Sequence, residues 1–184
     1  PIPDSGVSAA IGFSQKSSIP FELGIIRSHY VGRTFIEPSQ TIRQFGVKLK
    51  HSVNKSCIEN KKVILIDDSI VRGTTASKIV KMVYEAGAKE VHLGISCPPI
   101  MHPDFYGIDT PNYNELIASQ SDLNEMTKLV GAKSLFFLSL AGTYKAMGCD
   151  KRNPKTPQFT DHCFTGEYPI DVSEILEINK KINE

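Results

Sequence analysis

Two adjacent carboxylates, Asp67 and Asp68, directly follow a run of four apolar residues, Val63 to Ile66. The run is mostly β-branched, which predicts a strand that is buried on both faces, as in a parallel sheet. A turn rich in small and hydroxyl residues, Ser69 to Thr75, separates the carboxylates from a helical pattern that runs from Ala76 to Ala86. Loops at the carboxyl ends of parallel strands are where open α/β sheets bind ligands, so this stretch predicts a binding site.

The turn and the two carboxylates place different demands on a ligand. Backbone N–H groups of the turn, with the positive end of the helix behind them, favour an anion. Asp67 and Asp68 would repel a bare phosphate, but they suit a ligand that has hydroxyl groups or brings Mg²⁺. A ribose that carries a phosphate and a metal-bound diphosphate satisfies all of these demands. The alternative is that both acids only interact favourably with the dipole of the following helix or cap its N-terminus. That role explains one acid easily but two acids less well.

The same stretch resembles the motif that binds phosphoribosyl pyrophosphate (PRPP) in type I phosphoribosyltransferases. It is not a Walker A loop, because no Gly-Lys-Ser/Thr follows the turn. Other runs resemble the amidophosphoribosyltransferases, which commit PRPP to purine synthesis with ammonia from glutamine. The resemblance extends over nearly the whole chain, and the runs that carry it are residues 3–6, 21–27, 29–36, 98–100, 105–109, 115–118 and 163–166.

The resemblance implies an α/β chain with the type I phosphoribosyltransferase fold, a parallel doubly wound sheet with a flexible lid loop and a C-terminal helical tail. Local patterns agree, because strands alternate with helices. We expect further strands at Phe21–Ile26, Val91–Ser96 and Leu135–Leu138, and helices at Ser8–Ser17, Asp122–Val130 and Ser139–Met147.

The expected organisation is a PRPP-binding domain over residues 1–148, incomplete at its N-terminus, and a C-terminal extension over residues 149–184. The extension contains a helical pattern from Val172 to Ile182. Since the chain starts with Pro1, we expect it to be a segment of a longer protein that lacks the family's N-terminal glutaminase domain.

The resemblance also implies roles for individual residues. PRPP would be bound by Asp67, Asp68, Ser69, Ile70, Val71, Arg72, Gly73, Thr74 and Thr75. The metal would lie at Asp67 and Asp68, which also hold the ribose hydroxyls, with Ser5 nearby. The alternative for Ser5 is that it, or Asp4, only caps the helix that follows.

Arg27 and Tyr30 leave a predicted strand and are candidates for the diphosphate side of the site. Arg27 would neutralise charge on the leaving group. The alternatives are a surface charge for Arg27 and a half-buried aromatic with a solvated hydroxyl for Tyr30.

Residues 33–57 are basic, with few acids, and Thr41 to His51 show only a weak helical pattern. By itself such a segment indicates a solvated loop. The resemblance identifies it as the family's lid, which would exclude water from an oxocarbenium-like centre and bring cations to the departing diphosphate. Arg33 and Lys48 are the lid contacts that we expect.

Mg²⁺ is the expected cofactor, and no iron–sulfur cluster is expected. Some members of the family hold such a cluster with cysteines, but two of the matching positions here are Asp104 and Thr160. Since a cluster usually needs four thiolates, Cys163 is then an ordinary thiol. His162 as a substitute ligand is the alternative, although a lone histidine is more often structural.

The composition is that of an ordinary soluble globule, with 40% hydrophobic residues, 22% charged residues and a net charge of +1. It predicts neither a nucleic-acid nor a membrane partner. Four widely spaced cysteines without a Cys-x-x-Cys pair indicate reduced thiols in the cytoplasm. From the resemblance we expect a homo-oligomer when the protein is full length, with purine nucleotides as feedback inhibitors.

The expected function is the phosphoribosyl-transfer half of an amidophosphoribosyltransferase. Ammonia, supplied from glutamine in the intact enzyme, displaces diphosphate from PRPP and gives 5-phosphoribosylamine, the first committed step of purine nucleotide synthesis. The segment alone would use at most free ammonia. Two alternatives are a transferase that joins a free base to PRPP and a regulator that senses PRPP without chemistry. The regulator would need a nucleic-acid-binding element, and none is evident.

Overall fold

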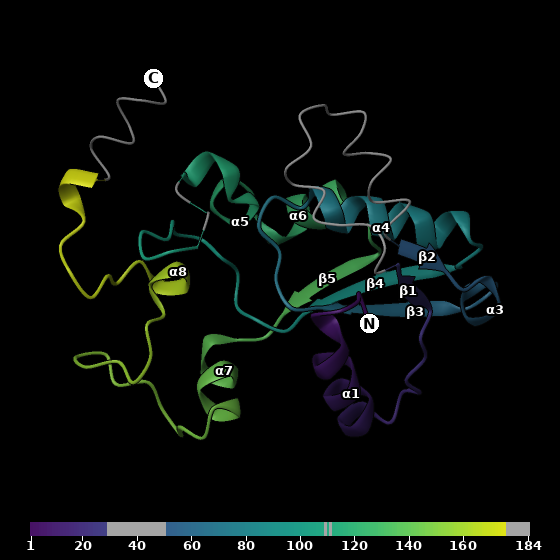
Figure 1. Cartoon of the computed structure of the whole chain (residues 1–184), viewed down its shortest axis with the longest axis horizontal. Helices are drawn as coiled ribbons and strands as arrows, with labels where there is room; N and C mark the ends of the chain where they lie inside the picture. The colour runs from purple at the N-terminus through teal and green to yellow at the C-terminus, as the bar shows by residue number, and fades with distance from the viewer. Residues whose placement is uncertain (29–50, 109, 111, 176–184) are drawn as a thin grey trace.

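The computed structural model describes residues 1–28, 51–108, 110 and 112–175 (Figure 1). Its centre is a parallel sheet of three strands, β3 (Lys62–Asp67), β4 (Glu90–Ile95) and β5 (Ser134–Phe137), in that order. The whole of β3 pairs with β4, from Lys62 opposite Glu90 to Asp67 opposite Ile95. The sheet confirms the α/β class predicted from the sequence.

Helices lie on both faces of this sheet (Figure 1). One face carries α4 (Thr74–Glu85) and α6 (Leu123–Val130), the other carries α1 (Gly6–Ser17), and α7 (Leu140–Ala146) follows β5 beyond the end of the sheet. The helices α4 and α6 are the crossovers that successive parallel strands require. The doubly wound arrangement is therefore confirmed, with helix ends within two residues of the expected ones for α1, α4, α6 and α7.

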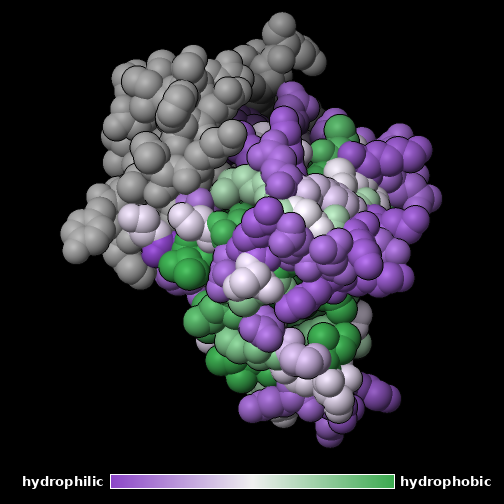
Figure 2. Space-filling model, turned by 90° about the vertical axis from the view of Figure 1, so that its right-hand side faces the viewer, coloured by the Kyte–Doolittle hydropathy of each residue, from purple (hydrophilic) through white to green (hydrophobic). Residues whose placement is uncertain are grey.

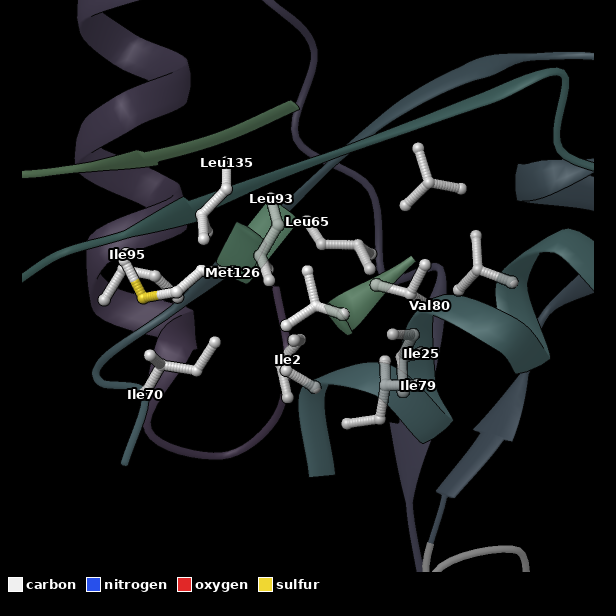
Figure 3. Close-up of a cluster of buried hydrophobic side chains, with 14 of the residues drawn as sticks. Ile2, Ile25, Leu65, Ile70, Ile79, Val80, Leu93, Ile95, Met126 and Leu135 are labelled. Carbon is white, nitrogen blue, oxygen red and sulfur yellow. The ribbon is translucent and has the colours of Figure 1, made fainter. Parts of the chain in front are cut away.

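The core fills the space between the sheet and the α4–α6 layer (Figure 3). Ile79, Val80 and Val83 recur on one side of α4 and are at most 1% exposed, as are Val91 and Leu93 of β4. Burial of such side chains contributes about 1.5–3 kcal/mol each. The core therefore fixes the position of β3 and of the turn that leads into α4.

Local sequence signals set the ends of α6. Asp122 accepts a hydrogen bond from the backbone N–H of Glu125, and the Glu125 side chain accepts one from the backbone N–H of Asp122. This capping box satisfies two N–H groups that the helix leaves open. Gly131 ends the helix at a φ of 75°, as a glycine C-cap does.

A separate antiparallel pair, β1 (Ile25–Arg27) and β2 (His51–Val53), lies beside the main sheet, and α3 (Lys55–Ile58) follows it. The strand expected at Phe21–Ile26 is wrong in extent, because residues 21–24 pair with no strand among the described residues. Of the weak helical pattern at Thr41–His51, residues 41–50 lie outside the described part. His51 begins β2 and is not helical.

The N-terminus of α1 also corrects an expectation. The helix begins at Gly6 and its N-cap position is Ser5, but the Ser5 side chain makes no capping hydrogen bond. The Asp4 carboxylate pairs with the guanidinium of Arg27 instead. Neither residue therefore caps the helix.

Two short elements lie between β4 and α6, the 3₁₀ helix η2 (Tyr113–Glu115) and α5 (Ile117–Gln120), and the short helix α8 (His162–Thr165) follows α7. The segment after Cys149 is tied back to α7, because Asp161 accepts hydrogen bonds from Tyr144 Oη (2.7 Å) and Arg152 Nε (2.5 Å). The helix expected at Val172–Ile182 falls mostly outside the described residues, and the boundary at residue 148 stays a prediction.

The surface in Figure 2 is hydrophilic in its upper part and more hydrophobic below. Several large apolar residues of α1 and the segment after it are exposed, among them Ile11, Ile19 and Leu23. Within the described residues, no helix is long and apolar enough to cross a membrane.

Candidate active site

One cavity of about 730 Å³ at the carboxyl end of β3 brings together most of the site residues that the sequence predicts. Its lining includes Ser5, Arg27, Asp67, Asp68 and all of residues 69–75. The remaining predicted residues, Tyr30, Arg33 and Lys48, and the proposed lid lie outside the described residues.

Asp67 and Asp68 are fixed by the ends of two neighbouring strands. Asp67 ends β3, and its carbonyl accepts a hydrogen bond from the N–H of Ser96, just after β4 (2.9 Å). The N–H of Asp68 donates to Asp67 Oδ1 (2.9 Å), and the N–H of Ser69 donates to Asp68 Oδ1 (2.7 Å). Both carboxylates are thereby oriented at the mouth of the cavity, Asp67 half-buried and Asp68 exposed.

The pKa of Asp67 is raised to about 7, chiefly by burial; the hydrogen bond from the Asp68 N–H opposes this rise, and the negative charge of Asp68 contributes to it. A cation beside the pair would favour the ionised carboxylate and would displace its proton. The pair is therefore an oxygen-donor site that becomes fully charged when a cation binds.

The turn that follows is held from one side by residues 115–117. The N–H of Ile117 donates to the Val71 carbonyl (2.9 Å), and the guanidinium of Arg72 pairs with the carboxylate of Glu115. Gly73 has a φ of 74°, and a Cβ there would lie 2.8 Å from Ile117 Cδ1. The positive φ is the conformation that favours a glycine here, and a Cβ would also push against the end of the Ile117 side chain.

Behind this turn, α4 begins at Thr74. The first N–H groups of a twelve-residue helix have no partner within the helix, and its dipole is positive at this end. Together with the hydroxyl groups of Thr74 and Thr75 in the lining, they make this part of the cavity a suitable phosphate site.

The N-terminal segment brings Ser5 to the opposite side of the cavity. The N–H of Ile2 donates to the Ile66 carbonyl (2.8 Å), so the chain enters alongside β3. A Cβ on Gly6 would lie only 2.3 Å from the same carbonyl oxygen. Because Gly6 has no side chain, α1 can start in contact with the end of β3 and place Ser5 on the cavity.

Three polar lining residues, Asp4, Ser8 and His51, were missed by the sequence reasoning. Asp4 was considered only as a helix cap, and His51 only as part of a basic segment. The pairing of β1 with β2 places Arg27 opposite His51, and the Asp4–Arg27 ion pair joins the N-terminal turn to this strand pair. The position of Asp4 in a turn beside Ser5 was a signal, whereas no sequence signal marked His51.

The donor set at the cavity fits Mg²⁺, since Asp67, Asp68 and Ser5 offer hard oxygen ligands of the kind that this ion prefers. Arg27, 29% exposed in its side chain, adds a positive charge on the same cavity. The arrangement therefore presents a metal-binding carboxylate pair, a phosphate-binding helix N-terminus and a cation around one space.

Among relatives, the chain is 62% identical over 170 residues to the amidophosphoribosyltransferase of Rhizobium etli, and 50% identical over 171 residues to that of Bacillus subtilis. These alignments cover 92% and 93% of the chain but 34% and 36% of the relatives, so the chain spans about a third of their length. No protein-family model matches the chain.

Solved structures give the same result. The glutamine PRPP amidotransferase of B. subtilis, in complex with ADP and GMP, superposes with a TM-score of 0.80 at 50% identity. The match covers 94% of this chain and 38% of that one. A second structure, described as the allosteric regulatory enzyme of purine biosynthesis, gives a TM-score of 0.76 at 48% identity, over 94% of this chain and 37% of that one. The resemblance to the amidophosphoribosyltransferases and the type I phosphoribosyltransferase fold that were expected from the sequence are confirmed.

Proposed function

We propose that this chain, which corresponds to the phosphoribosyltransferase part of the amidophosphoribosyltransferases, transfers the 5-phosphoribosyl group of PRPP to ammonia. The lone pair of ammonia attacks the anomeric carbon of the ribose, and the bond from that carbon to diphosphate breaks. Diphosphate leaves with the bonding electrons, and the new amine loses a proton to water. The product is 5-phosphoribosylamine.

The observation that carries this proposal is the single cavity that holds Asp67, Asp68 and the whole turn from Ser69 to Thr75. A phosphate fits the N-terminus of α4, and the ribose hydroxyls fit the carboxylates. The cavity then offers binding groups for PRPP from its 5′-phosphate to its ribose ring.

The remaining polar residues would act on the leaving group. When bound at Asp67 and Asp68 with Ser5 nearby, Mg²⁺ would neutralise charge on the diphosphate. The Arg27 guanidinium would do the same from the β1 side, after exchanging its Asp4 partner for phosphate oxygens. We expect positioning and electrostatics to supply most of the rate, because neutral ammonia needs no strong base.

The wider assignment follows from the resemblance. Tyr30, Arg33 and Lys48 would complete the site from the lid, and a glutaminase domain would supply ammonia in the full-length protein. Since one similar structure contains ADP and GMP, we infer that purine nucleotides bind to this protein and inhibit it. A homo-oligomeric protein that works in the cytosol, where its four free cysteines stay reduced, fits the same family.

The test is to measure diphosphate release from PRPP by the purified protein with Mg²⁺, with and without ammonium at mildly alkaline pH. Release that requires ammonium is the expected result. Free purine and pyrimidine bases are offered in parallel, because release that requires a base would show a salvage transferase instead. Binding of PRPP without release under any of these conditions would point to a regulator and contradict the proposal.

Calorimetry with Mg²⁺ and PRPP tests the site itself. Asp67→Asn and Asp68→Asn each remove a charge from the carboxylate pair, so we expect each to lower PRPP affinity by at least about 10-fold. Asp150→Asn is the matched control, because Asp150 is exposed and does not line the cavity. Unchanged affinity in both cavity variants would show that PRPP is not held by these carboxylates.

A further inference from the structure

A second group of potential ligands lies outside the cavity described above. It consists of Asp104, from the stretch between β4 and η2, and of His162 and Cys163, the first two residues of α8. The fold brings these residues together across a sequence separation of 58 and 59 residues. The proposed phosphoribosyl transfer uses none of them.

Their donor atoms form a compact triangle. His162 Nε2 lies 2.8 Å from Asp104 Oδ2, Cys163 Sγ lies 3.4 Å from the same nitrogen, and Sγ lies 3.9 Å from Oδ2. In a tetrahedral site with metal–ligand bonds of about 2.0–2.3 Å, two ligand atoms are about 3.3–3.6 Å apart. The observed edges bracket that range, so small side-chain movements would seat one ion.

This triangle is not the arrangement of a nucleophilic triad. In a triad, the nucleophile and the carboxylate bind opposite nitrogens of the imidazole. Here both the thiol and the carboxylate face Nε2. Convergence of three donors on one point is the geometry of a coordination site.

The surroundings hold the donors in place. The side chains of Asp104 and His162 are 4% and 6% exposed. Asp104 Oδ1 accepts the N–H groups of Tyr106 and Ile108, both at 2.8 Å, which leaves Oδ2 directed at the histidine. A ligand carboxylate fixed by hydrogen bonds of this kind is typical of metal sites.

Backbone and aromatic contacts close the group. The Cys163 carbonyl accepts the N–H groups of Met101 (2.9 Å) and His102 (3.0 Å), which fixes α8 against the Asp104 stretch. The rings of Tyr106 and Tyr168 lie 5.0 and 5.2 Å from the His162 ring, by their centroids. The donors therefore meet in an enclosed place, where a bound ion would join the two segments.

We propose that Asp104, His162 and Cys163 bind one Zn²⁺ ion, with water as the fourth ligand. Nitrogen, sulfur and carboxylate oxygen are the ligand atoms of protein zinc sites, whereas a thiol and an imidazole do not suit Mg²⁺. When Zn²⁺ binds His162 Nε2 in place of the hydrogen bond to Asp104, the neutral imidazole carries its single proton on Nδ1, and the Cys163 thiol releases its proton to water. The bound ion fastens α8 to the stretch that follows β4.

The first test is the metal content of the full-length protein, purified without chelator, by plasma mass spectrometry. We expect about one zinc per chain. Replacement by Co²⁺ should then give the near-ultraviolet charge-transfer absorption of a cobalt–thiolate bond. Cys163→Ser should lose this band, and Cys149→Ser, which alters another half-buried free thiol, should keep it.

Competition with a chromophoric chelator measures affinity. His162→Gln should lower zinc affinity by more than about 100-fold, since even changes behind the ligands cost about 10–100-fold. Circular dichroism shows whether each variant is folded. If His162→Gln does not fold, the zinc affinity of Cys163→Ser tests the proposal in its place. Folded wild-type protein that binds neither zinc nor cobalt would overturn the proposal. So would equal affinity in Cys163→Ser, or iron with inorganic sulfide in place of zinc.

Discussion

Replacing Asp67 by Asn should make the ligand-free protein more stable at pH 8 while it weakens PRPP binding. Burial raises the pKa of this carboxyl from 3.8 to about 7 in the folded protein. The folded state therefore binds a proton more tightly than the unfolded state, and stability falls as pH rises from about 4 to about 7. Above pH 7 the folded protein carries the full cost of the ionised side chain, which Asn removes.

The magnitude follows from the same pKa. A rise from 3.8 to about 7 corresponds to about 4 kcal/mol, at about 1.36 kcal/mol for each pKa unit. Asp67 borders an open cavity, where water screens its charge, so we expect about 2 kcal/mol at pH 8. For a chain of this size, that is a rise in Tm of about 4–8 °C.

Urea denaturation of wild type and Asp67→Asn at pH 4.5 and pH 8 measures the effect. The stability gain should be clearly smaller at pH 4.5 than at pH 8, because pH 4.5 lies only just above the unfolded-state pKa of 3.8, and it should reach its full value at pH 8. Asp150→Asn is the matched control, because this carboxylate is exposed and does not line the cavity, so its replacement should change stability little. An equal gain at both pH values, or no gain at pH 8, would refute the argument that burial of Asp67 is costly.

Two glycines give further predictions, each with a glycine elsewhere as control. Gly6→Ala should destabilise the protein by about 1–3 kcal/mol in urea denaturation, because its Cβ would lie 2.3 Å from the Ile66 carbonyl oxygen. Gly12→Ala in the same helix, with no atom within 4 Å of its Cβ, should instead stabilise it by about 0.5–1 kcal/mol; equal effects would contradict the close approach of α1 to β3. Gly73→Ala should weaken PRPP binding by at least about 10-fold in calorimetry, since φ is 74° and Ile117 fills the space. Gly148→Ala, at a φ of 82° and far from other atoms, should cost stability but leave affinity unchanged, and a loss in both would mean that strain alone weakens binding.

The main α/β order could be predicted because its signals are local. The apolar run before Asp67 and the alternation of strands with helices predict buried parallel strands. The capping box at Asp122 and Glu125 marks the start of α6, and Gly131 its end. The short strands β1 and β2 could not be predicted in the same way, because three residues carry too little periodicity and their pairing is set by a partner distant in sequence.

The candidate site also has one part that the local sequence predicts and another part that depends on the tertiary structure. The sequence by itself predicts the ligand class, because two carboxylates, a turn and a helix are consecutive in the chain and their chemistry follows from their order. Only the tertiary structure decided which residues surround them. Ser5, Asp4 and Arg27 line the same cavity as Asp67 because Gly6 permits close contact with β3 and because Asp4 pairs with Arg27. The convergence of Asp104 with His162 and Cys163 was likewise decided by the packing of α8 against a stretch far away in sequence, since contacts of this kind depend on the whole fold and leave no local pattern.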